Sequence, residues 1–218
     1  MKNFKKLITV LLSTLMLVTM IAGCGKKTET PEKFAEAFHH LTIYGDTSAL
    51  TSLGLNDEEA NTLNTQLEQT FKDAIKNNLN SAGLSFTDDN INNIFEAQLN
   101  AQKRTTCTIE PVSSDAETAV VKIKTTHVDI VGLDEKAAND AMTEVQNMNI
   151  TDRKTALNKL SELYISKLIE NCTGAEPSSD TVENTFAFKK VTDDKNRKVW
   201  VPDNPVTFGN KLATMVTR

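Results

Sequence analysis

The chain has 218 residues, of which 39% are hydrophobic, 24% charged and 6% aromatic, and its net charge is −5. This composition is typical of a folded globular protein, and eight glycines with five prolines exclude a collagen-like or low-complexity chain. The acidic balance argues against nucleic-acid binding, which depends on a basic surface, so we expect no nucleic-acid partner.

The amino-terminal residues 1–23 have the parts of a secretory signal peptide. Lys2, Lys5 and Lys6 form a positive region, and an almost wholly apolar run follows over residues 7–22 and ends in small residues. The run is slightly short for a stable transmembrane helix. We therefore exclude this segment from the reasoning about the fold.

Cys24 directly follows the leader. The sequence Ile21-Ala22-Gly23-Cys24 resembles the lipobox of bacterial lipoproteins, in which an aliphatic residue and two small residues precede a cysteine. The resemblance implies that the Cys24 sulfur receives a diacylglyceryl group and that the leader is cleaved between Gly23 and Cys24. The alternatives are an ordinary secretory signal that ends near a cysteine and an uncleaved membrane anchor. Apart from the covalent lipid on Cys24, we expect no cofactor.

Lipidation at Cys24 would anchor the mature protein to a membrane. Loss of the leader removes three lysines and no acidic residue, so the net charge changes from −5 to −8. Two or more acyl chains anchor a protein stably, whereas a single chain does not. Residues 24–29 form the lipidated cysteine and a short linker, and residues 30–218 form a single domain. We therefore expect this domain at the cell membrane, lipid-anchored on the extracytoplasmic face.

The domain is expected to begin with three helices. Apolar residues recur at helical spacing in three segments of residues 30–99, so each helix should bury one stripe. The predicted starting signals are Thr30-Pro31, Asn56 with Glu59 three residues later, and Thr87 or Asp88. The first helix is expected to end at Gly45-Asp46 and the second near Gly83.

The pattern changes to that of strands after Arg104. Residues 104–112 and 118–131 are rich in Thr and β-branched residues, and the turn at Ser113-Ser114-Asp115 between them predicts a hairpin. Residues 134–172 return to helical spacing. Because Thr151-Asp152 looks like a fresh helix cap, this stretch is either two helices or one kinked helix.

The last part of the chain adds two strands and a helix. Residues 182–191 and 198–201 are predicted as strands joined by a turn at 193–196, and residues 206–218 as a short final helix. Helices followed by strands predict an α+β fold class. We expect amino-terminal helices packed on a bent antiparallel sheet, with a long helical insert between strands.

The order of elements resembles the cystatin-like cone of the nuclear-transport-factor-like superfold. The chain also resembles a group of small, uncharacterised lipoproteins of low-GC Gram-positive bacteria. Those proteins carry an alternating strand like Ala119–Ile130 and a late aromatic strand like Val199-Trp200-Val201. The resemblance implies a helical layer packed into a strongly bent sheet, and it brings no established activity.

The histidines show few signs of a catalytic or metal-binding role. Phe34, Phe38 and Leu41 share one arc of the first helix, so His39 and His40 are expected on the solvated face. In the 118–131 strand, His127 and Asp129 lie two residues apart and hence on one face. Enzymes of the cone superfold use Asp and His inside the cup, so the resemblance makes this pair the candidate for general base catalysis.

The cysteines and acidic residues also have simple interpretations. Cys107 and Cys172 are candidates for a disulfide in an exported protein, although Cys107 also fits as a small core residue. The run Asp88-Asp89-Asn90 opens like a calcium loop but lacks the later glycine and glutamate, so a helix cap explains it better. Since His and Cys residues do not cluster, we expect no metal site.

The sequence indicates the function only at the level of a broad class of protein. No nucleophile motif, glycine-rich phosphate loop or metalloprotease motif is present, so we expect no catalytic residues. We expect a membrane-tethered binding module for a small ligand or an envelope partner, held in a cup or on the sheet face. The alternatives are a structural envelope protein that dimerises through its sheet face and a cone-fold enzyme using His127 and Asp129.

Overall fold

The computed structural model describes residues 29–192 and 198–218. The predicted leader, the predicted lipidation site Cys24, most of the linker and the predicted turn at 193–196 therefore lie outside the described residues.

Seven α-helices, one π-helical turn and four strands make up the described chain. In chain order they are α1 (Pro31–His39), η3 (His40–Tyr44), α2 (Ser48–Ser52), α3 (Asp57–Ser81), α4 (Asp88–Gln102), β1 (Cys107–Ser114), β2 (Thr118–Thr126), α5 (Ile130–Asn147), α6 (Arg153–Gly174), β3 (Thr181–Thr192), β4 (Lys198–Pro202) and α7 (Pro205–Val216). The strands form one antiparallel sheet in the order β1-β2-β3-β4. The α+β class predicted from the sequence is confirmed.

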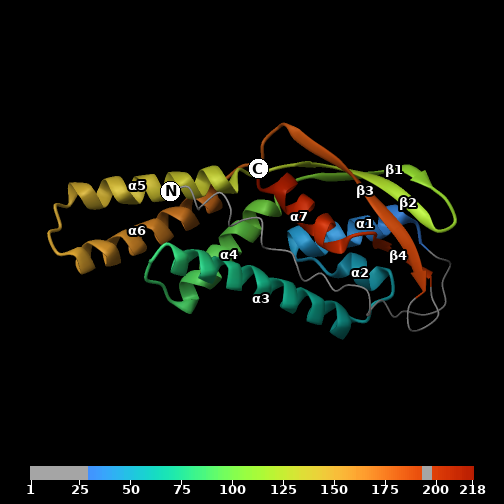
Figure 1. The fold of residues 1–218 in the computed structure, drawn as a ribbon, viewed down its shortest axis with the longest axis horizontal. Helices are drawn as coiled ribbons and strands as arrows, with labels where there is room; N and C mark the ends of the chain where they lie inside the picture. The colour runs from blue at the N-terminus through green and yellow to red at the C-terminus, as the bar shows by residue number, and fades with distance from the viewer. Residues whose placement is uncertain (1–28, 193–197) are drawn as a thin grey trace.

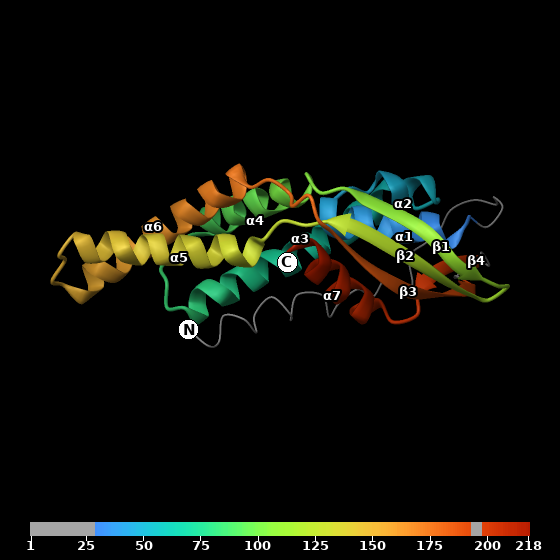
Figure 2. The ribbon, with the colours of Figure 1, turned by 90° about the horizontal axis from the view of Figure 1, so that it is seen from above.

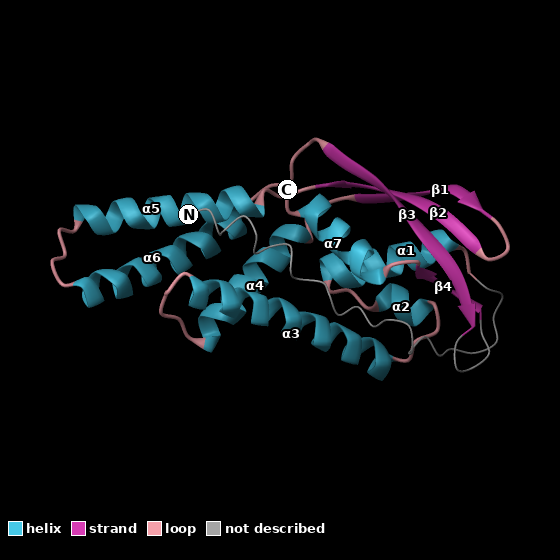
Figure 3. Ribbon diagram, in the orientation of Figure 1, coloured by secondary structure: helices cyan, strands magenta, loops and turns pink. Residues whose placement is uncertain are grey.

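The elements separate into two halves along an elongated molecule. In Figure 1 the sheet lies at one end, and the α5–α6 hairpin extends to the other. α1 and α7 pack against one face of the sheet, as the view from above also shows (Figure 2). α3 and α4 connect the two halves. All of the strands lie at one end of the molecule, and the other end consists of helices alone (Figure 3).

Helix starts follow the capping signals. The Asn56 side chain accepts a hydrogen bond from the Glu59 amide, and the Glu59 side chain accepts one from the Asn56 amide. Thr87 and Asn90 form the same reciprocal pair at the start of α4, which confirms the cap interpretation of this polar run. The stretch predicted from 134 to 172 is two helices, and Asp152 caps the second of them.

The boundary between β2 and α5 was predicted wrongly, and the short helix α2 was not predicted. The strand expected to reach residue 131 ends at Thr126, and the helix expected from residue 134 begins at Ile130. The Asp129 side chain caps this helix by accepting a hydrogen bond of 2.7 Å from the Gly132 amide. β-branched residues at 128, 130 and 131 imitate a strand, but the cap and the packing of α5 on α6 decide the conformation.

The hydrophobic residues form two clusters. The first joins α1, α7 and the inner face of the sheet, and its largest buried side chains include Phe38, Leu41, Phe188, Phe208 and Leu212. The second joins α4, α5 and α6 and includes Ile94, Ala137, Tyr164, Leu168 and Cys172. Complete burial of one large side chain contributes roughly 2 kcal/mol. Each half of the molecule therefore has its own core.

The outer face of the sheet is polar. Lys122, Lys124, Glu183 and Thr185 alternate with the buried residues of β2 and β3, and Lys122 pairs with Glu110 at 2.9 Å. Among the described residues, no helix is long and apolar enough to span a membrane.

Candidate functional site

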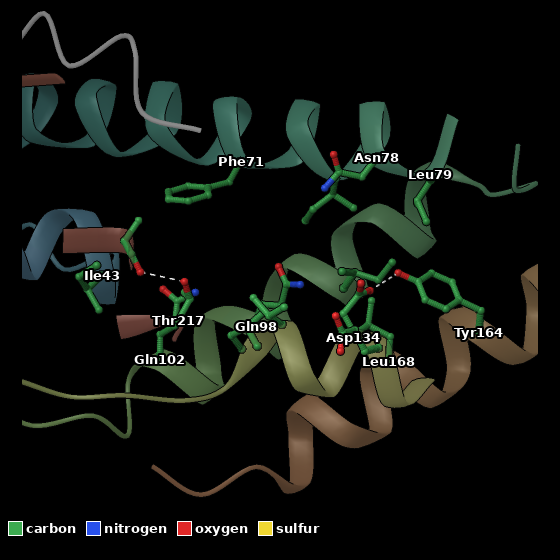
Figure 4. A pocket seen from close by; sticks show the side chains of 16 residues that line it. Ile43, Phe71, Asn78, Leu79, Gln98, Gln102, Asp134, Tyr164, Leu168 and Thr217 are labelled. Carbon is green, nitrogen blue, oxygen red and sulfur yellow. Dashed lines mark hydrogen bonds between the residues drawn. The ribbon is translucent and has the colours of Figure 1, made fainter. Parts of the chain in front are cut away.

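A pocket of about 120 Å³ lies where the two halves of the molecule meet (Figure 4). Its walls are mostly apolar and come from both hydrophobic clusters. The apolar lining residues are Ile43, Phe71, Ile75, Leu79, Ile94, Ile130, Val131, Leu168 and Ala213. All of the lining elements are helical or follow α7 directly, so this pocket is not the cup of the sheet in which a ligand was expected.

Asp134 and Tyr164 form a hydrogen-bonded pair in the pocket wall. Asp134 lies in the first turns of α5, and Tyr164 faces it from the antiparallel helix α6, so the hairpin brings the two together. The Tyr164 hydroxyl donates to the Asp134 carboxylate. Burial raises the pKa of Asp134, and the hydrogen bond from Tyr164 opposes that rise. Burial and the adjacent carboxylate raise the pKa of Tyr164, so the phenol stays protonated.

Three side-chain amides also line the pocket. Asn78 comes from α3, and Gln98 and Gln102 come from α4, one helical turn apart. None of these three amides makes a hydrogen bond to another side chain or backbone group of the described residues. Thr217 is already engaged, because its hydroxyl donates to the Ala213 carbonyl at 2.8 Å. The amides are therefore available to a bound molecule.

The pocket lacks the groups that would hold a metal ion. Over residues 29–192 and 198–218, no three His, Cys, Asp or Glu side chains come close enough together to bind one. The pocket instead provides a concave, mostly apolar surface with a few hydrogen-bonding groups, which is the usual composition of a ligand-binding site.

His127 and Asp129, the candidate catalytic pair, are not on one face of a strand. Both follow the end of β2 at Thr126. The Asp129 side chain is exposed and caps α5, whereas the His127 ring has a buried Nδ1 without a partner among the described residues. Neither residue lines the pocket described above.

His39 is also placed differently from the prediction. It was expected on the solvated face but is completely buried, and its ring lies 5.0 Å from that of Tyr44. The reason is that neighbours surround this segment, since α2 and the sheet pack against α1 while α4 and α7 contact η3. His40 is partly exposed, as predicted, with its Nδ1 3.4 Å from Asp46.

Cys107 and Cys172, the candidate disulfide pair, are free thiols in the structure. Cys107 packs at the edge of the first hydrophobic cluster, whereas Cys172 is buried inside the second. Burial raises the pKa of Cys107 to about 12 and that of Cys172 to about 11, so both thiols are protonated at neutral pH. The two residues act as small core residues.

Asp134 and Tyr164 were not identified from the sequence. One signal was present, because Tyr164 lies within the apolar stripe of its helix, and a buried tyrosine hydroxyl usually needs a partner. The preceding helix could supply one from its first turns. No sequence pattern indicated that Asn78, Gln98 and Gln102 would line a pocket, because their position depends on how separate helices pack.

Comparison with known proteins gives the family and the fold. A family model described as a domain of unknown function (DUF5105) matches residues 21–214. No curated protein matches the chain. A crystal structure described as "a putative lipoprotein (ycdA)" from Bacillus subtilis superimposes with a TM-score of 0.58 at 17% identity. The match covers 85% of this chain and 56% of that one, so this chain spans little more than half of that protein and shares its fold. Since the family model covers most of its length, the chain belongs to the DUF5105 family.

Proposed function

We propose that this protein is a lipid-anchored extracytoplasmic lipoprotein whose domain binds a small ligand without chemical change. The observation that carries the proposal is the apolar pocket at the junction of the two halves. Its volume of about 120 Å³ suits a molecule of about six non-hydrogen atoms, since an apolar cavity of roughly 150 Å³ takes up benzene.

The position of the pocket supports a binding role. Its walls combine Ile43 and Phe71 from the first half with Ile94, Ile130 and Leu168 from the second. A ligand there would contact both hydrophobic clusters at once. Because a molecule that binds only the folded state stabilises it, occupation would strengthen the junction between the halves.

The proposed location rests on the leader and the lipobox around Cys24. The fold it shares with the Bacillus subtilis protein described as a lipoprotein agrees with this. A lipid anchor would keep the binding domain concentrated at the outer surface of the membrane.

Dimerisation through the sheet has less support. The outer face presents Lys122, Lys124 and Glu183, whereas a stable dimer needs a continuous apolar patch. The exposed large hydrophobic residues of the described chain are Val112, Met142, Met148, Leu157 and Val206. They are spread over β1, the α5–α6 hairpin and α7 instead of the middle of the sheet.

The binding role can be tested by methyl NMR on the mature protein in lipid nanodiscs, with isopentanol as the probe. Four isoleucines line the pocket, namely Ile43, Ile75, Ile94 and Ile130, and Ile109 and Ile150 do not. We expect saturable shifts of the first four δ1 methyl signals and unchanged signals from the other two.

A pocket-filling variant provides the specificity control. Ala213→Met places a larger side chain in the pocket wall and should abolish the saturable shifts. Ala187→Met adds the same side chain at an exposed position of β3 and should leave them intact. Absence of saturable shifts in the wild-type protein with isopentanol, isopentylamine and isovalerate alike would contradict the binding role.

A further inference from the structure

All of the charged groups in the pocket wall are acidic. Asp134 and Glu135 line the pocket, and no Lys, Arg or His does. The ion pairs formed among the described residues include neither of these two carboxylates. The pocket therefore carries negative charge that no side chain of the described chain neutralises by direct contact.

Asp134 has spare capacity to accept hydrogen bonds. A carboxylate has two oxygens that together accept about four hydrogen bonds, and among the described residues only the Tyr164 hydroxyl donates to this one. Burial removes much of the water that would otherwise solvate it. A carboxylate in such a site is stabilised when a cation enters the pocket and lies against it.

We propose that the pocket selects small organic cations, namely primary ammonium compounds with a short apolar body. The ammonium group donates to the free oxygen of the Asp134 carboxylate, and the apolar body contacts Ile75, Ile94 and Leu168. This inference rests on the proposed binding function, and it names the class of ligand for that same pocket.

Three further features favour a cation over a neutral or anionic ligand. The unpartnered amide oxygens of Asn78 and Gln98 can accept the remaining ammonium hydrogens. The aromatic rings of Phe71 and Tyr164 in the wall attract cations through their faces. The mature chain without its leader has a net charge of −8, which raises the local concentration of cations. The negative charge and the ring faces also repel a carboxylate.

The test compares three probes of nearly equal size and different charge at pH 7.5. Isopentylamine is a cation at this pH, isopentanol is neutral and isovalerate is an anion. Dissociation constants are taken from the δ1 methyl shifts of the four pocket isoleucines in the nanodisc-embedded protein. We expect the amine to bind at least tenfold more tightly than the alcohol and isovalerate not to bind.

A matched pair of variants assigns the effect to one carboxylate. Asp134→Asn removes the charge but keeps an oxygen that can accept from Tyr164, and it should weaken amine binding at least tenfold while changing alcohol binding less than twofold. Glu96→Gln removes an exposed charge of α4 that does not line the pocket and should change amine binding less than threefold. Unchanged signals from Ile109 and Ile150 verify that both variants are folded.

The outcomes separate this inference from the proposed function. If the alcohol binds as tightly as the amine, or if Asp134→Asn leaves amine binding unchanged, selection of cations is wrong and the binding role stands. If no probe shifts the pocket isoleucines, the binding role itself is wrong.

Discussion

The buried imidazole of His39 couples stability to pH. Neither ring nitrogen has a hydrogen-bond partner among the described residues. Burial, assisted by the nearby His40, lowers the pKa of His39 from 6.5 to about 4 because it disfavours the charged ring. The folded state thus binds a proton less readily than the unfolded state. The contribution of the neutral His39 ring to stability is fully present above pH 6.5 and is lost as the pH falls toward 4.

We predict that His39→Phe removes most of this pH dependence. A lowering of the pKa from 6.5 to about 4 corresponds to about 3 kcal/mol between those limits. The phenylalanine ring keeps the contact with Tyr44 and has no buried polar atom. Urea unfolding at pH 7.5 and pH 4.5 should therefore show a much smaller loss of stability for the variant than for the wild type.

The matched control is His40→Gln, which changes the partly exposed neighbour. It should retain the acid sensitivity of the wild type. An equal loss of stability in wild-type and His39→Phe proteins would show that His39 is not the group responsible.

The placement of His39 could not be predicted from periodicity. A single helical stripe gives the correct burial when a helix packs on one side only, and Phe34, Phe38 and Leu41 are indeed buried as predicted. Around His39 the α-helix gives way to the π-helical turn η3, and neighbours lie on several sides. Such an environment depends on α4 and α7, which are distant in the sequence.

At the scale of elements, local signals predicted most boundaries. The capping pairs at Asn56 and Thr87 and the cap at Asp152 gave correct helix starts, because each acts within four residues. The boundary at Asp129 was predicted wrongly because Val128, Ile130 and Val131 have high strand propensity. Packing of α5 against α6 overrode that propensity.

The cap that Asp129 forms at the start of α5 can be tested by mutation. A Cβ at Gly132 would lie 2.1 Å from an Asp129 carboxylate oxygen, so glycine allows the side chain to cap the helix closely. Asp129→Ala should lower the free energy of unfolding by about 1 kcal/mol, and Asp129→Asn, which retains a capping oxygen, should be nearly neutral. Urea unfolding measures both. An equal loss in the two variants would show that the hydrogen bond to Gly132 does not stabilise α5.

At the scale of the whole molecule, the fold class followed from the order of elements but the pocket did not. Its lining comes from η3, α3, α4, α5, α6 and the end of α7. The Val216 carbonyl accepts a hydrogen bond from the Val128 amide, which places the end of α7 beside the start of α5. No sequence pattern reports a contact between segments this far apart, so this pocket could not be predicted from the sequence.

A lipid anchor on Cys24 would decide where this pocket is exposed. Cys24 and the leader lie outside the described residues, and their assignment rests on the order of charged, apolar and small residues before Cys24. Export and attachment of lipid at that sulfur would place the pocket, with its two carboxylates, at the outer surface of the membrane.

Mass spectrometry of the amino-terminal peptide of the membrane-associated protein tests this directly. We predict a chain that begins at Cys24 and carries a diacylglyceryl thioether, and we predict that Cys24→Ser yields either an uncleaved precursor or a protein released from the membrane. An unmodified amino terminus at residue 24, or the intact leader on protein recovered from the cytosol, would contradict the proposed lipoprotein.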